Sequence, residues 1–225
     1  MEQEKELSSA EICGEEKAAK FVLGGSLLEG LGGLATTVLA FLALWLFVPS
    51  FFGAVATIIV GLALLFDAGL LSARLPFLLL EVGKGEVEAE RFRGGLAAEL
   101  VGGIIAVILG IMSLCGVDPT TLTAFAAVVL GTALLLESGV VSRLSSFVVR
   151  RPGESGSRAE MARRCVRMAA SLQVFVGLGT IVLGILALLG LHPGFLSLVA
   201  LLAVGLSTAF SGASLGWRML KLVHH

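Results

Sequence analysis

The chain contains 225 residues, of which 56% are hydrophobic and 15% charged, and its mean hydropathy is +0.99. Soluble domains carry about 25% charged residues, so this composition excludes soluble globular, disordered and collagen-like proteins and predicts an integral membrane protein. The formal net charge of -1 offers no excess of positive charge for a nucleic-acid partner.

Apolar runs alternate with short polar segments along the chain. A transmembrane helix needs about 20 apolar residues to cross the hydrocarbon core. Runs of this length predict six helices, near residues 22–47, 51–73, 97–116, 120–142, 170–190 and 195–217. The helices form three pairs, and a proline, which ends one helix and opens the next, lies in the short turn of each pair: Pro49, Pro119 and Pro193. The predicted fold class is all-α, a polytopic membrane protein of three α-hairpins.

The three hairpins are copies of one unit. Glycine, leucine and proline recur at identical spacing in each: Gly33, Leu39, Leu44, Pro49 and Gly61, then Gly103, Leu109, Leu114, Pro119 and Gly131, then Gly177, Leu183, Leu188, Pro193 and Gly205. We expect the repeats, residues 22–75, 96–144 and 169–218, to form a pseudo-threefold bundle. Around them lie an acidic tail (1–21), a charged connector (76–95), a basic connector (145–168) and a C-terminal tail (219–225).

Positive charge lies on one side of this arrangement. All 16 lysines and arginines precede the first helix, follow the last, or fall between hairpins. Because basic loops stay on the cytoplasmic side, the pattern predicts that both termini lie in the cytoplasm.

The basic connector has two interpretations. Residues 150–157 are typical of a flexible linker, and residues 158–170 are expected to form a basic helix. That helix either lies on anionic lipid headgroups through Arg163, Arg164 and Arg167 or is a solvated entry turn into the fifth transmembrane helix.

Polar side chains recur at two positions of the apolar repeat. The first position, at a constant spacing before the turn proline, holds Glu29, Glu99 and Gln173, and the second, at a constant spacing after the glycine of the second helix, holds Asp67, Glu137 and Ser211. Ionisable residues inside membrane spans are costly and normally face a bundle interior with a partner. We expect the two polar groups of each hairpin to face each other in the cytoplasmic leaflet.

Two interpretations of this polar cluster are open. In the first it is structural, with Arg74 and Arg143 reaching the carboxylates along the same helices. In the second it forms a proton or ion path. Glu29 and Glu99 are also expected in the first turns of their helices, where the helix dipole favours a negative charge.

Small residues on one face of a membrane helix allow close helix packing. The repeat assigns this role to Gly33, Gly61, Gly103, Gly110, Gly131, Gly177, Gly184 and Gly205. Gly69 and Gly139 are expected to pack in the same way on the second helices.

Motifs of known enzymes are absent: there is no Walker A run, GxSxG or HExxH. The three cysteines, Cys13, Cys115 and Cys165, have no metal-ligand spacing. We therefore expect a non-enzymatic protein with no metal and no cofactor. Its expected partners are membrane lipids and either a second copy of the chain or a larger membrane complex.

The repeat, with its glycines, its turn proline and the acidic residue of the second helix, resembles that of the HdeD-like membrane proteins. The resemblance covers residues 24–217 and rests on Gly103, Gly110, Pro119, Gly131, Gly139 and their counterparts. It implies six helices in three hairpins, a location in a prokaryotic inner membrane, and a stress-associated or accessory role without a catalytic residue. The alternatives are a proton or small-cation channel or carrier that uses the intramembrane carboxylates and, as a third hypothesis, a lipid-binding protein.

Overall fold

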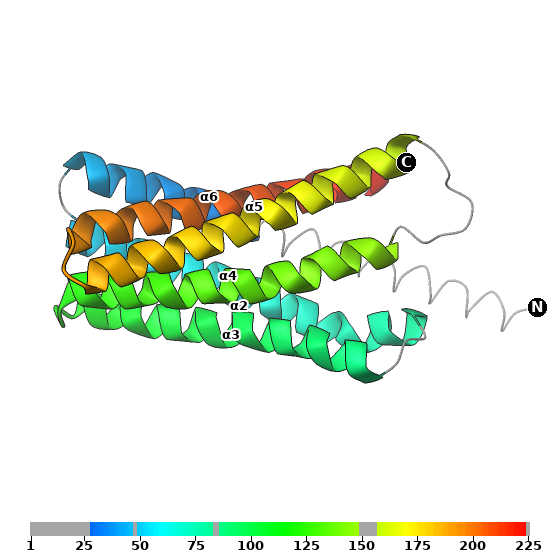
Figure 1. Cartoon of the computed structure of the whole chain (residues 1–225), viewed down its shortest axis with the longest axis horizontal. Helices are drawn as coiled ribbons and strands as arrows, with labels where there is room; N and C mark the ends of the chain where they lie inside the picture. Colours follow the sequence, from blue (N-terminus) through cyan, green and yellow to red (C-terminus); the bar gives the residue numbers. More distant parts are fainter. Residues whose placement is uncertain (1–27, 47–48, 83–85, 149–156, 224–225) are drawn as a thin grey trace, which may run out of the picture.

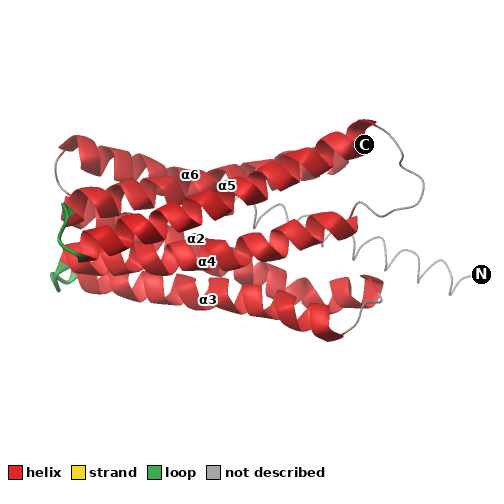
Figure 2. Ribbon diagram, in the orientation of Figure 1, coloured by secondary structure: helices red, strands yellow, loops and turns green. Residues whose placement is uncertain are grey.

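The computed structural model describes residues 28–46, 49–82, 86–148 and 157–223, with side chains described in 28–46, 50–69, 94–138 and 171–212. The described chain consists of helices joined by turns (Figure 2). The helices are Leu28–Leu46, α2 (Pro49–Val82), α3 (Glu86–Leu114), α4 (Pro119–Val148), α5 (Ser157–Leu188) and α6 (Pro193–Val223). They lie side by side in an elongated bundle (Figure 1).

Each of the six helices contains a segment long and apolar enough to cross a membrane. The predicted all-helical membrane fold is therefore confirmed. The second helices begin at the turn prolines themselves, because proline suits the first helical position, where its missing N–H has no partner to lose.

Several helices extend well beyond the predicted bounds. The charged stretch 76–95 belongs mostly to α2 and α3, and the basic stretch 158–170 is continuous with α5. Alanine, glutamate and arginine there are good helix formers, so the helices continue past the apolar spans. Glu99 consequently lies more than three turns inside α3 instead of in its first turn. The predicted linker, except for its last residue, lies outside the described residues.

The second helices of the three hairpins form the centre of the bundle. The helices α2, α4 and α6 contact one another, whereas α3 contacts only α2 and α4 among the labelled helices. In the membrane-spanning segments of α2, α4 and α6, 44–50% of the residues are buried, against 28–33% in the first helices. Each first helix therefore presents most of its surface to the outside of the bundle, where apolar side chains would meet lipid.

Glycines face each other where the second helix of one hairpin meets the first helix of the next. A Cβ built on Gly61 would lie 3.0 Å from the Gly103 carbonyl oxygen, and one on Gly103 would lie 2.9 Å from that of Gly61. The same reciprocal approach joins two further pairs, at 2.7–2.9 Å: Gly131 with Gly177, and Gly205 with Gly33. The third pair returns from α6 to the first helix, so the three contacts close a ring.

A second contact lies two turns further along two of these interfaces. A Cβ on Gly110 would lie 3.0 Å from the Ala54 carbonyl oxygen, and one on Gly184 would lie 3.0 Å from that of Ala124. Gly69 differs from the expectation, since a Cβ there would meet no heavy atom of the described residues within 4 Å outside its own helix backbone. The surroundings of Gly139 lie outside the described side chains.

The turns of the second and third hairpins have the same hydrogen bonds. After α3, the Val117 and Gly116 N–H groups donate to the carbonyls of Met112 and Ser113. This pair of hydrogen bonds forms a Schellman motif, in which the residue just after the helix has a left-handed backbone conformation. Gly116 and the equivalent Gly190 have φ of 85° and 88°, so glycine ends these helices without strain.

Replacing Gly177 by alanine tests the glycine pairing. The added Cβ would lie 2.9 Å from both the Gly131 carbonyl oxygen and Leu135 Cγ, and overpacking of this kind costs about 1–3 kcal/mol. We expect Gly177→Ala to lower the free energy of unfolding by this amount in detergent titrations with SDS. Gly179→Ala, on the same helix with no atom within 4 Å of the new Cβ, is the control and should be neutral or stabilising. Equal effects of the two changes would contradict the pairing.

The hydrogen bonds at the turn between α3 and α4 predict that its contribution to stability depends on pH. Hydrogen bonds from Thr121, together with one from the Thr120 hydroxyl at 3.2 Å, hold the pKa of Asp118 below its ordinary value. A carboxylate with a lowered pKa stabilises the fold above its unfolded pKa of about 3.9 and loses this contribution as pH falls through the folded value.

We therefore expect the difference in melting temperature between the wild type and Asp118→Asn to change as pH falls from about 5 to about 2, the range around the unfolded pKa. The wild type should lose stability relative to the variant, whose amide does not titrate. Parallel melting curves over this range would show that the carboxylate is uncoupled from folding.

Candidate functional site

The six polar positions of the repeat lie far from the hairpin turns, toward the opposite end of the membrane-spanning segments. Asp67 lies near the end of the segment Ser50–Gly69, which starts at a turn, and Glu99 lies near the beginning of Gly94–Leu114, which ends at one. The six side chains come from all six helices. Glu29, Glu99, Glu137 and Gln173 are buried, whereas Asp67 and Ser211 are partly buried.

Hydrogen bonds join these side chains in three pairs. Asp67 of α2 pairs with Glu99 of α3, which requires one proton shared by the two carboxyl groups because a carboxylate can only accept. The Gln173 amide of α5 donates to Glu137 of α4. The Ser211 hydroxyl of α6 donates to Glu29 of the first helix.

Each hydrogen-bonded pair joins neighbouring hairpins, although in the first hairpin Glu29 and Asp67 also lie close together, as the sequence predicts. The physical reason is the glycine contact at the same interfaces: the second helix of each hairpin approaches the first helix of the next most closely. The pairing follows the same closed order as the glycine pairs, ending with α6 against the first helix. The polar side chains thus repeat the pseudo-threefold arrangement.

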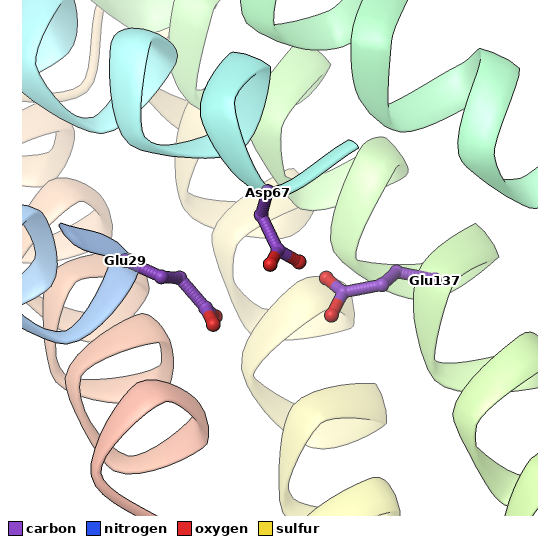
Figure 3. Close-up of side chains that lie close together, drawn as sticks. All are labelled: Glu29, Asp67 and Glu137. Atoms are coloured by element: carbon purple, nitrogen blue, oxygen red, sulfur yellow. The ribbon is translucent and has the colours of Figure 1, made fainter. Parts of the chain in front are cut away.

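Three of the carboxyl groups converge. Glu29, Asp67 and Glu137 each offer an oxygen atom, and these atoms all lie within 4.8 Å of one another. Figure 3 shows the three side chains reaching from different helices toward a common point. Within the first hairpin, Glu29 and Asp67 are thus close neighbours without being hydrogen-bonded to each other.

Among the four carboxyl groups at the polar positions, two oxygens have no hydrogen-bond partner among the described residues. They are Oε2 of Glu29, a side chain 3% exposed, and Oε1 of Glu99, a side chain 1% exposed. An unsatisfied polar atom away from water costs about 1–3 kcal/mol. These oxygens are therefore positions where a bound proton, ion or water would gain stability.

An apolar cluster adjoins the carboxyl groups on the side of the hairpin turns. It contains Val60 and Leu64 of α2, Leu130 and Leu134 of α4, and Leu201 and Val204 of α6, each no more than 1% exposed. These residues fill the contact between the three central helices. A polar path that runs from the carboxyl groups along the bundle toward the hairpin turns therefore ends at this apolar layer.

The predicted basic partners lie outside the described side chains. This applies to Arg74 and Arg143, proposed to reach the carboxylates, and to Arg163, Arg164 and Arg167, proposed to bind lipid headgroups. All six polar positions were found in the sequence. The sequence did not predict that the carboxyl groups of Glu29, Asp67 and Glu137 converge. Metal sites are recognised in a sequence by closely spaced ligands, whereas these residues come from three separate helices.

Comparisons with protein-family models, with curated protein sequences and with solved structures gave no match. The carboxyl cluster, formed by Glu29, Asp67 and Glu137, is therefore the main indication of function among the described residues.

Replacing Gln173 by leucine tests the polar pairs. The change removes the amide that donates to Glu137, which is 8% exposed, and leaves a buried acceptor without its partner. We expect a loss of about 1–3 kcal/mol in the free energy of unfolding. Phe175→Leu, on the same helix at a side chain 74% exposed, is the control. Unchanged stability of the Gln173 variant would mean that this hydrogen bond contributes nothing.

Proposed function

We propose that this integral membrane protein is a carrier for small cations, protons included, that uses the carboxyl cluster as its binding site. The observation that carries the proposal is the convergence of Glu29, Asp67 and Glu137 inside a bundle of six apolar helices. Intramembrane carboxyl groups that face a bundle interior are typical of ion and proton pathways.

The position of the apolar layer favours a carrier over an open pore. Buried leucine and valine side chains of α2, α4 and α6 fill the axis between the carboxyl groups and the hairpin turns. A cation bound at the cluster would therefore reach it from the end of the bundle opposite the turns. The basic residues predict that this end faces the cytoplasm, and passage to the other side would require the central helices to separate.

The second candidate is a non-enzymatic accessory or stress-response protein of the HdeD-like type, in which the carboxyl groups only hold the helices together. The observation that favours it is the hydrogen-bonded pairing of the six polar positions. In this case the cluster stabilises the ring of hairpins and moves no ion.

Flux measurements in liposomes distinguish the two candidates. We expect vesicles containing the wild type to show proton or cation flux above empty vesicles. The double variant Asp67→Asn, Glu137→Gln should lose most of this flux, at least tenfold, because amides keep the shape but provide no negative charge. Folding of both proteins is checked by SDS titration in detergent.

Asp118→Asn is the matched control for this experiment. It exchanges a carboxylate for an amide on the exposed turn before α4, outside the cluster, and should leave flux unchanged. Absence of flux in wild-type vesicles would overturn the carrier proposal and favour the accessory role.

A further inference from the structure

We infer that Glu29, Asp67 and Glu137 form a binding site for a divalent cation of the size of calcium. This inference rests on the proposed function, which it deepens by naming the class of cation. It departs from the sequence-based expectation of a chain without a metal site.

The spacing of the three oxygens fits such an ion. Calcium binds oxygen at 2.3–2.6 Å, so two of its ligand atoms can be about 4.6–5.2 Å apart when they lie on opposite sides of the ion. The three carboxyl oxygens lie within 4.8 Å of one another. Three oxygens spaced evenly around calcium would be about 4.0–4.5 Å apart, so an ion at their centre needs at most small movements of the side chains. Magnesium binds at 2.0–2.1 Å in strict octahedral geometry, so its ligand oxygens are at most about 4.2 Å apart, and it demands a tighter and more regular arrangement than calcium does.

The available donor atoms are of the kind that calcium prefers. Carboxylate, hydroxyl and amide oxygens are hard ligands that favour calcium, magnesium or manganese over zinc or copper. Glu29 Oε2 has no hydrogen-bond partner among the described residues although the side chain is only 3% exposed. The Glu29 carboxyl group points toward Asp67 and Glu137 (Figure 3), which is the orientation that a shared cation requires.

Each of the three proposed ligands is also oriented by a second residue from a neighbouring hairpin. Ser211 donates to Glu29, Gln173 donates to Glu137, and Glu99 is hydrogen-bonded to Asp67. Outer partners of this kind fix the direction of metal ligands. Every helix of the bundle thus contributes one side chain, either as a ligand or as the partner of a ligand.

Charge favours a divalent over a monovalent cation. When all three are ionised, the carboxyl groups carry three negative charges inside an apolar bundle, where uncompensated charge is expensive. A divalent ion would neutralise two of these charges and a monovalent ion only one.

Isothermal titration calorimetry of the full chain in detergent tests the site, with calcium chloride or magnesium chloride as the only divalent salt. We expect calcium to bind the wild type, and to bind more tightly than magnesium. Glu29→Gln and Asp67→Asn should each weaken calcium binding at least tenfold, whereas Asp118→Asn should bind as the wild type does. Calcium binding that is absent, or that is equal in all four proteins, would overturn the inference.

A second measurement uses only the wild type, so it tests the site even if the variants do not fold. A hydrophobic carbodiimide modifies carboxyl groups within the membrane, and peptide mass spectrometry identifies the modified residues. Calcium should protect Glu29, Asp67 and Glu137 from modification, and unchanged labelling in its presence would contradict the site.

The two proposals fail in different ways. Proton or monovalent-cation flux in liposomes without calcium binding would overturn the divalent site and leave the carrier intact. Calcium binding without any flux would support the site and overturn the carrier.

Discussion

Close contact between helices across the hairpin boundaries is the constraint on which the bundle depends. Inside a bilayer, helices gain no hydrophobic free energy by leaving lipid for one another, so association relies on van der Waals contact and hydrogen bonds. The three reciprocal glycine pairs, Gly61 with Gly103, Gly131 with Gly177 and Gly205 with Gly33, let the backbones touch. A side chain at any of these positions would separate two hairpins.

This contact decides how the polar side chains are used. Because the second helix of each hairpin lies against the first helix of the next, Asp67 meets Glu99, Glu137 meets Gln173, and Ser211 meets Glu29. The central helices then bring Asp67 and Glu137 toward the bundle axis, where Glu29 joins them. The carboxyl cluster is therefore a product of the same interfaces that hold the hairpins together.

The third repeat breaks the symmetry of the site. It has Gln173 and Ser211 where the other repeats have carboxyl groups, so the two polar positions, each present three times, hold only four acidic side chains. The amide and the hydroxyl donate hydrogen bonds to Glu137 and Glu29. Loss of charge in one repeat thus limits repulsion and leaves three carboxyl groups oriented toward a common point.

Much of the fold could be predicted from the sequence, because apolar length, turn prolines and the glycine repeat are local signals: they indicated six helices, three hairpins and the six polar positions. The length of the helices beyond the membrane spans could not, since charged helix formers give no apolar signal. Tertiary structure alone decided which polar residues meet. Glu29, Asp67 and Glu137 are far apart in the sequence and lie on three separate helices. Only the closure of α6 against the first helix, through backbone contact at Gly33 and Gly205, brings their carboxyl groups to one point.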